Sequence, residues 1–440
     1  MAKRRLLEHI VCPHCWARFK PEEVLWIAQS PNLKGDRVLS ENDAARFLPT
    51  EFNADGFAID LDGYPCSEHA CPRCHLRLPQ GALEAPTLFM SIVGAPATGK
   101  SYYLASSTFR LRSVLPRDFM INFTDADAEM NQRVREIEDL QFFSGDKFVK
   151  LEKTEANSGD MYDMVSLNGQ STIFPRPFVF SARPANDHPN LDKTDRLART
   201  ICLYDNAGES YLASRDADAA DAPVTRHLAQ SACIFFLFDP TQDARFRNRC
   251  KEFSDDPQLL DADDLGKTDV RRSTQRQEAV LSEMIKRVRT YLKMKNADRY
   301  KKPFIVIVPK LDVWKPLVSV DNLELIAKVA YKGVDYNALN MKRLKRLSDQ
   351  VRGMLMDYAP EFVGAVDSFA SDVAYLPVSA TGISPTVSKE TGTTGFRSND
   401  LKPIWPEIPM LYAISRTAPG LIPVDSKDAS GGSKLVLNKD

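Results

Sequence analysis

The chain has 440 residues, of which 43% are hydrophobic and 27% are charged. These values are ordinary for a globular protein of roughly two to four domains, and they exclude a disordered, collagen-like or disulfide-stapled chain. Because 58 Lys and Arg residues balance 59 Asp and Glu residues, the net charge of −1 provides no overall attraction to nucleic acid or to an anionic membrane.

The longest apolar runs, such as residues 233–238, are far shorter than the roughly 20 residues that a membrane-spanning helix needs. Residues 1–10 are basic but lack the apolar core and small-residue cleavage site of a secretory signal. We therefore expect a cytoplasmic protein with no membrane partner. In that reducing compartment, paired cysteines indicate metal binding rather than a disulfide.

The first predicted unit is a cysteine-rich front end, residues 1–85. Its pairs Cys12/Cys15 and Cys71/Cys74 each place two thiolates on one tight turn, and two such turns complete a tetrahedral site for a structural Zn²⁺ with no open position. The long spacing between the pairs predicts a zinc-ribbon-like domain with a folded insertion between its two knuckles. A redox role for the pairs is the alternative. Reserve ligands are Cys66, His69 and His75.

An apolar strand at residues 88–93 runs into a loop that matches the pattern G-x-x-x-x-G-K-[ST] in full, and a helical pattern over residues 102–111 follows. Such a loop turns backbone N–H groups onto phosphate oxygens at the positive end of the helix dipole. Lys100 would contact the β- and γ-phosphates, and Ser101 would bind Mg²⁺. The residues expected to bind the nucleotide are Gly94, Ala95, Pro96, Ala97, Thr98, Gly99, Lys100 and Ser101.

Further apolar, β-branched or aromatic runs predict the remaining strands at residues 177–181, 200–204, 232–238, 303–308 and 373–378. Helical periodicity is visible over residues 273–295 and 341–358. Strands that alternate with helices predict an α/β fold with a mainly parallel six-stranded sheet.

We assign residues 86–416 to one P-loop NTPase domain. Its long connections predict helical insertions at about 112–175 and 240–300, because structureless loops of that length are uncommon. Residues 417–440 are polar and rich in Gly and Ser, which predicts a flexible tail.

Three short motifs follow predicted strands. Asp-Asn-Ala-Gly-Glu occupies residues 205–209, Pro-Lys-Leu-Asp occupies residues 309–312, and Ser-Ala occupies residues 379–380. In this order they resemble the D-x-x-G, N-K-x-D and S-A motifs of translation-factor and regulatory GTPases, over roughly residues 86–416. The zinc-ribbon front and long insertions also make the chain look like GTPases of bacterial conflict and defence clusters, including double-GTPase groups.

The resemblance implies a Mg²⁺-dependent switch that binds GTP and hydrolyses it to GDP. Asp205 is expected to hold Mg²⁺, and the Gly208 N–H to meet the γ-phosphate. Asp312 would accept two hydrogen bonds from guanine, and the Lys310 stem would lie along the base. At the Ser379–Ala380 motif, the backbone N–H of Ala380 would meet the guanine carbonyl.

The chain departs from the family pattern at two positions. Pro309 replaces the usual Asn or Thr. Glu209 stands where many regulatory GTPases have the Gln that orients water, and the γ-phosphate would repel its carboxylate. We therefore expect slow hydrolysis that a protein partner or self-association accelerates. Thr172 is the candidate switch threonine, chosen over Thr124, Thr154 and Thr194.

Two other functions compete with the GTPase. In a P-loop ATPase, Asp239 would follow a Walker-B-like strand, although Pro240 stands where a catalytic Glu is expected. In an interaction module, the nucleotide would be bound with little turnover while the zinc front docks a protein or nucleic acid. The basic stretch 271–302 fits the second idea, but it has no interleaved aromatic residues, so a solvated helix face is favoured over nucleic acid.

Overall fold

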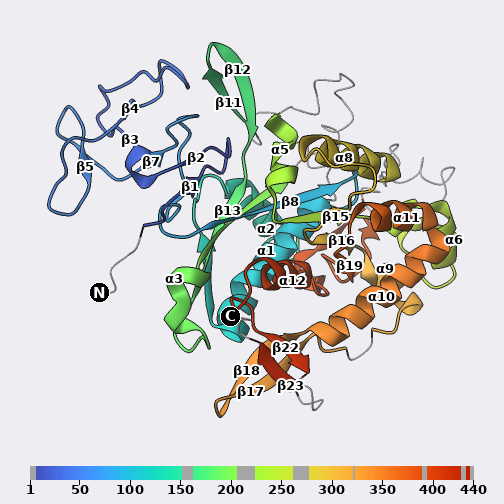
Figure 1. Cartoon of the computed structure of the whole chain (residues 1–440). Helices are drawn as coiled ribbons and strands as arrows, with labels where there is room; N and C mark the ends of the chain where they lie inside the picture. Colours follow the sequence, from blue (N-terminus) through green and yellow to red (C-terminus); the bar gives the residue numbers. More distant parts are fainter. Residues whose placement is uncertain are drawn as a thin grey trace.

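The computed structural model describes residues 6–150, 162–205, 223–260, 277–320, 323–388, 394–427 and 433–436. Its centre is a seven-stranded sheet with the order β19-β16-β15-β8-β14-β13-β9 (Figure 1). The strands are β8 (Thr87–Gly94), β9 (Ile121–Asp125), β13 (Phe178–Pro184), β14 (Arg199–Asp205), β15 (Cys233–Leu237), β16 (Phe304–Val308) and β19 (Val373–Pro377).

The five strands from β19 to β14 are mutually parallel, whereas β13 runs antiparallel to both of its neighbours. All residues of β15 and β16 are buried, as the continuous apolar runs predict for strands covered on both faces. The α/β fold with a mainly parallel sheet is therefore confirmed. The additional strand is β9, whose alternating burial is typical of an edge strand and whose short sequence Ile-Asn-Phe-Thr-Asp gave no clear signal.

The path of the chain through the sheet reverses at β8. The strands β13 and β14 lie on one side of β8, and the chain then crosses to β15, β16 and β19 on the other side. In open α/β sheets, ligands bind at such a switch point, outside the carboxyl ends of the strands. The sheet therefore has one edge that is suited to a ligand, and this edge carries the loops that follow the five parallel strands.

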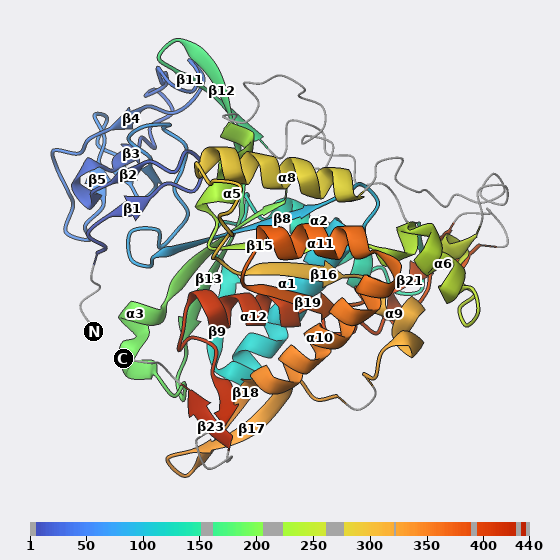
Figure 2. The same cartoon turned by 45° about the vertical axis from the view of Figure 1, so that its right-hand side comes forward.

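Helices cover both faces of the sheet. One layer contains α5 (Pro223–Gln230), α8 (Gln277–Tyr291) and α11 (Pro360–Phe369), and the opposite layer contains α1 (Lys100–Phe119) and α12 (Ile408–Thr417) (Figures 1 and 2). The first layer packs through contacts such as the stacked rings of Phe238 and Phe362. The edge strand β19 packs against α10 (Met341–Tyr358), which has the bounds that its apolar periodicity predicts.

The connections carry more β structure than expected. Between α1 and β13 lie α2 (Gln132–Phe142), β10 (Phe148–Lys150) and a hairpin of β11 (Tyr162–Leu167) and β12 (Gln170–Pro175). Strand β10 pairs with β21 (Thr394–Arg397), which pairs with β20 (Thr386–Val387). Further helices are α3 (Thr194–Leu197), α6 (Ala244–Cys250) and α9 (Leu311–Trp314), with 3-10 turns η1 (Pro21–Glu23), η2 (Leu191–Lys193), η4 (Pro240–Gln242), η5 (Pro257–Leu259), η6 (Lys315–Leu317) and η7 (Ser398–Asp400).

The prediction of a flexible tail from residue 417 onward is wrong for two of its segments. A second sheet contains β17 (Ile326–Tyr331), β18 (Val334–Asn340), β22 (Val424–Lys427) and β23 (Ser433–Val436). Val424 pairs with the buried Leu339, and Leu435 is buried in a small cluster with Val329. Two apolar residues in a polar segment, Val424 and Leu435, are thus enough to add strands to the β17–β18 hairpin.

The front end, residues 6–85, contains only strands of two or three residues. They are β1 (Ile10–Val11), β2 (Arg18–Phe19), β3 (Leu25–Ile27), β4 (Arg46–Phe47), β5 (Ala58–Ile59), β6 (Pro65–Cys66) and β7 (His69–Ala70). Its core also includes Val165 and Phe174 from the β11–β12 hairpin. Among the described residues, no helix has the length and apolar character required to span a membrane.

Candidate functional site

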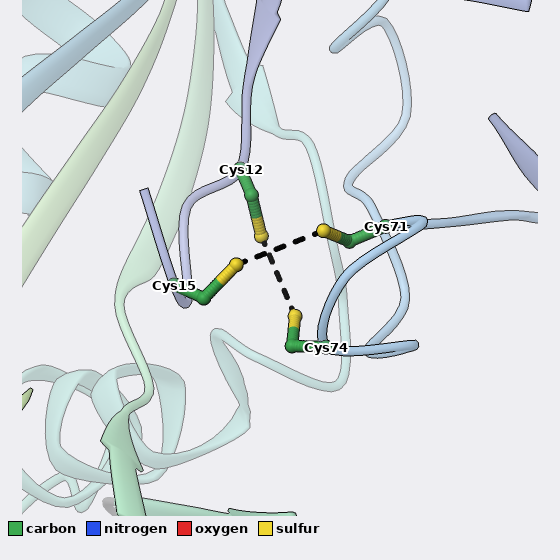
Figure 3. A group of neighbouring side chains, drawn as sticks. All are labelled: Cys12, Cys15, Cys71 and Cys74. Atoms are coloured by element: carbon green, nitrogen blue, oxygen red, sulfur yellow. Dashed lines mark hydrogen bonds between the residues drawn. The ribbon is translucent and has the colours of Figure 1, made fainter. Parts of the chain in front are cut away.

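Four buried sulfurs meet in the front end (Figure 3). The Sγ atoms of Cys12 and Cys74 lie 3.7 Å apart, as do those of Cys15 and Cys71, and the four ligand atoms all lie within 4.8 Å of one another. A tetrahedral Zn²⁺ with Zn–S bonds of about 2.3 Å places its sulfurs roughly 3.8 Å apart. The cluster therefore fits a structural zinc site, and the predicted convergence of the two cysteine pairs is confirmed.

The two knuckles have the same local geometry. The residue after each second cysteine has a positive φ, 54° at Trp16 and 58° at His75, and its N–H donates to the carbonyl of the first cysteine. Burial and the neighbouring sulfurs raise the pKa of the Cys12 thiol, a shift that a bound cation would oppose.

The reserve ligands have other partners. His75 Nδ1 lies 2.7 Å from Asp36, the Cys66 thiol faces Asp60 at 3.8 Å, and the His69 ring packs on Trp26 with centroids 4.3 Å apart. These bonds and packing contacts occupy all three side chains outside the four-sulfur cluster. The site is thus a closed set of four cysteines.

A buried contact between a histidine and a carboxylate joins the first knuckle to the hairpin. His14, between the two cysteines, places Nδ1 3.3 Å from Asp163 Oδ2, and Arg176 lies 2.6 Å from the other oxygen of that carboxylate. Burial acts to raise the pKa of Asp163, but the hydrogen bonds and charges of these two residues hold it at about 2. The carboxylate is therefore ionised at neutral pH and fastens β11 to the knuckle.

The glycine-rich loop, residues 94–101, connects β8 to the first turn of α1. A Cβ added at Gly94 would lie 3.0 Å from the Leu237 carbonyl oxygen, and Gly99 has a φ of +84°, so both positions favour glycine. Lys100 Nζ donates to the carbonyls of Gly94 at 2.9 Å and Ala95 at 3.3 Å. Its ammonium group therefore lies directly over the loop.

Asp205 ends β14 at the same edge of the sheet. It is opposite Ile92 of β8 in the register, two residues before the loop begins at Gly94. Its Oδ1 is buried and has no hydrogen-bond partner in the described part of the chain. Burial raises the pKa of this carboxyl, while the positive charges of Lys100 and Arg133 lower it. A buried carboxylate oxygen that no described donor satisfies is a suitable ligand for a hard divalent metal ion.

The loop after β16 is tied to the loop after β15. Lys310, which has a φ of 60°, places Nζ 2.7 Å from Oδ2 of the fully buried Asp239 and donates to Thr241 Oγ1 at 3.2 Å. The carbonyl of Pro309 accepts a hydrogen bond from the buried indole Nε1 of Trp314 at 2.8 Å. Local bonds therefore fix this loop although an Asn is absent from its first position.

Asp312 and Ser379 lie at neighbouring loops of the same edge. Burial raises the pKa of Asp312, and hydrogen bonding to Ser379 opposes that shift. Ser379 Oγ accepts from the Gly382 N–H at 2.7 Å, and the Ala380 carbonyl accepts from Gln141 Nε2 of α2 at 3.0 Å. The described members of the three motifs thus gather outside the carboxyl ends of the parallel strands.

Other predicted positions lie elsewhere. Gly208 and Glu209 lie outside the described residues, as do Arg271, Arg272 and Arg276 of the basic stretch. Thr172 is on β12, opposite Val165, in the hairpin that packs on the front end. Thr172 therefore pairs within this hairpin, and its role as a switch residue stays a prediction.

Sequence reasoning missed two side chains near the site. Arg133 and Gln141 both come from α2, an insertion with no recognisable motif. Arg133 adds charge near Asp205, and Gln141 holds the Ala380 carbonyl. Only the three-dimensional packing of α2 against α1 reveals them. The position of Asp239 just after an apolar strand was visible in the sequence. Its pairing with Lys310 was not.

Comparison with known proteins gives one distant likeness. No protein-family model matches the chain. A curated protein of Mycolicibacterium smegmatis, described as a putative ESX-1 scaffolding and assembly protein, is 23% identical to this chain over 257 residues. The match covers 54% of this chain and 59% of that relative, so the chain spans about three-fifths of the relative's length. This similarity is too low and too partial to assign a family.

Proposed function

We propose that the chain is a Mg²⁺-dependent, GTP-binding and GTP-hydrolysing switch on a P-loop domain, with zinc in the four-cysteine cluster. One observation carries the proposal: Lys100, Asp205 and Asp312 lie at or just after the carboxyl ends of β8, β14 and β16, on the edge of the sheet that contains its switch point. An enzyme that transfers phosphoryl groups needs such positioned charges more than it needs covalent chemistry.

The phosphate half of the proposed site is the glycine-rich loop with its lysine. Lys100 and the N–H groups at the start of α1 would bind the β- and γ-phosphates, while Ser101 and Asp205 would hold Mg²⁺. The ion would neutralise charge on the transferred phosphate oxygens. The raised pKa and the buried Oδ1 of Asp205 support this role, because a divalent cation there would relieve the desolvation of the carboxylate.

The two aspartates beside β8 distinguish the GTPase from the ATPase alternative. Asp205 follows β14 and feels the charge of Lys100, whereas Asp239 follows β15 and forms a buried ion pair with Lys310. Because Asp239 already has a cationic partner at 2.7 Å, it is the poorer candidate for a metal-binding Walker-B carboxylate. The arrangement favours the GTPase.

The base half of the proposed site is Asp312 with Lys310 and the Ser379–Ala380 loop. An ionised carboxylate can accept hydrogen bonds from the ring N–H and the exocyclic amine of guanine, and adenine lacks this pair of donors. The Trp314–Pro309 bond offers a physical reason why the departure at Pro309 is tolerated.

Direct binding measurements test the proposal. Zinc-loaded full-length protein should bind GTP with Mg²⁺ at least about 100-fold more tightly than ATP, because the wrong base leaves Asp312 unpaired. Asp312→Asn should remove the preference, whereas Asp349→Asn, an exposed aspartate on α10, should not. Equal affinity for the two nucleotides would reject the guanine assignment, and no binding at all would reject the switch.

A scaffold with little turnover is the second candidate function. The observation that favours it is the likeness to a protein described as a scaffolding and assembly protein. In this case the bound nucleotide would order the domain for a protein partner or for a second copy. A GTP turnover assay with the isolated protein separates the candidates: slow multiple turnover supports the switch, and tight binding without turnover supports the scaffold.

A further inference from the structure

The first zinc knuckle contacts the sheet at the strand that ends in Asp205. The residue before Asp205 is Tyr204, whose hydroxyl donates to the Pro13 carbonyl at 2.5 Å and accepts from Trp16 Nε1 at 3.1 Å. Pro13 lies between the two cysteines of the knuckle, and Trp16 follows the second one. Two hydrogen bonds thus join the four-cysteine cluster to the end of β14.

The Tyr204 ring packs against aromatic side chains from the knuckle and from α5. It is fully buried, and its ring centroid lies 6.0 Å from that of Trp16 and 5.0 Å from that of His227. His227 Nδ1 in turn lies 2.6 Å from the Oγ of Ser91, the residue of β8 that is opposite Tyr204 in the register. The contact therefore reaches both β14 and the strand that carries the glycine-rich loop.

Successive side chains of a strand point to opposite faces of the sheet. Tyr204 points to the face that packs against Trp16 and the front end, so Asp205 points to the face that is covered by α1. The two residues share a peptide bond. A displacement of the knuckle that pulls on the tyrosine would therefore move the neighbouring carboxylate on the other side of the sheet.

We propose that Tyr204 is a positioning residue that couples metal occupancy of the four-cysteine site to Mg²⁺–nucleotide affinity at Asp205. This inference rests on the proposed function of the Asp205 edge. Without metal, the knuckle loses the ligand bonds that define it. The Tyr204 hydroxyl then loses buried partners, and the end of β14 is no longer fixed for metal binding.

Thermodynamic linkage makes the proposal quantitative. If zinc tightens Mg²⁺–nucleotide binding by a given factor, Mg²⁺–nucleotide must tighten zinc binding by the same factor. We expect a factor of about ten, within the usual range for coupled sites. A merely structural role of zinc would instead weaken nucleotide binding with and without Mg²⁺ alike.

The experiment uses the full-length protein and measures both sides of this linkage. GDP affinity is measured in zinc-loaded and zinc-stripped protein, once in buffer with Mg²⁺ and once in buffer that contains neither Mg²⁺ nor EDTA. Zinc affinity is measured by chelator competition with and without Mg²⁺–GDP. Zinc removal should weaken GDP binding about tenfold with Mg²⁺ and less than about twofold without it. Mg²⁺–GDP should tighten zinc binding by the same tenfold.

Tyr204→Phe separates coupling from folding, because this variant keeps all four cysteines. It should retain bound zinc and lose most of the coupling factor. Tyr300→Phe is the matched control, since Tyr300 is also buried and its hydroxyl has no hydrogen bond within the described residues. Full coupling in Tyr204→Phe, or equal loss in Tyr300→Phe, would overturn the proposal.

Hydrogen exchange distinguishes failure of this inference from failure of the proposed function. Absence of nucleotide binding in zinc-loaded wild type would reject the proposed function and, with it, the coupling to nucleotide. The contact of Tyr204 with the knuckle is then tested by hydrogen exchange in β14, which should become faster on zinc removal and in Tyr204→Phe. Unchanged exchange in both samples would show that the knuckle does not hold the strand.

Discussion

The front end and the central sheet bury their interiors by different means. In the front end, strands of two or three residues surround a core that contains four cysteines. In the sheet, strands of five to eight residues bury large apolar side chains such as Phe235, Phe236 and Ile305. Because a small core contributes little stability, such a domain usually depends on a metal or disulfides, whereas the sheet does not.

The difference also determines where the chemistry lies. In the front end the four cysteines are part of the buried core, so metal binding there would be coupled to folding. In the sheet domain, Asp205 lies at a strand end and Lys100 and Asp312 follow strand ends, while the core below them is apolar. Changes in the front end should therefore act on its fold, and changes at the sheet edge should act on binding.

The largest expected effect is the loss of a zinc ligand. Cys71→Ser should abolish tight zinc binding, which in small zinc domains is worth on the order of 10 kcal/mol, and should unfold the front end. Limited proteolysis would then cleave within residues 6–85 while the sheet domain persists. Cys66→Ser, a buried cysteine outside the cluster, is the control and should keep its zinc. A folded Cys71→Ser front end would show that the apolar core alone is sufficient.

The next effect is at the sheet edge. Lys100→Ala should weaken nucleotide binding by about 100-fold, or roughly 3 kcal/mol, because charge-assisted hydrogen bonds to phosphate are lost. The melting temperature should change little, because Lys100 is only partly buried. Calorimetric titration measures the affinity, and Lys345→Ala, on the exposed face of α10, provides the control. If Lys100→Ala lost much stability but kept its nucleotide affinity, the expectation that changes at the sheet edge act on binding rather than on folding would be wrong.

The Asp163 carboxylate, which contacts the first knuckle through His14, predicts a pH dependence. The pKa of Asp163 is lowered from 3.8 to about 2, so its stabilising effect is complete above pH 4 and is lost as the pH falls through 2. A shift of this size corresponds to roughly 2 kcal/mol at neutral pH. Denaturant unfolding should show wild type more stable than Asp163→Asn at pH 7 and nearly equal to it near pH 2. A constant difference at all pH values would contradict the ionic explanation.

The smallest effect is expected for Gln141→Leu. This change removes the hydrogen bond to the Ala380 carbonyl and should cost about 1 kcal/mol in loop order. We expect GTP affinity to fall roughly fivefold, with no change in zinc content. Replacement of the exposed Gln132 at the start of α2 by Leu is the matched control. An unchanged affinity would mean that α2 does not support the base loop.

The features that the sequence predicted are those set by residues close together in the chain. The Cys-x-x-Cys spacing predicted that four cysteines converge, and the three- and four-residue periodicity predicted the bounds of α10. The six apolar runs gave six of the seven central strands. Contacts between distant residues left no comparable signal. Tyr204 and Pro13 are separated by 191 positions, and Gln141 and Ala380 by 239, so neither pair is visible in any sequence window.

The β11–β12 hairpin has a consequence for protein engineering. Its residues Val165 and Phe174 are each only 2% exposed because they complete the interior of the front end, although they belong to a later part of the chain. A truncated protein that begins at residue 86 would expose both side chains to water and create an apolar patch prone to aggregation. The front end is thus not a detachable module, and trimming the protein to its sheet domain requires removal or redesign of the hairpin.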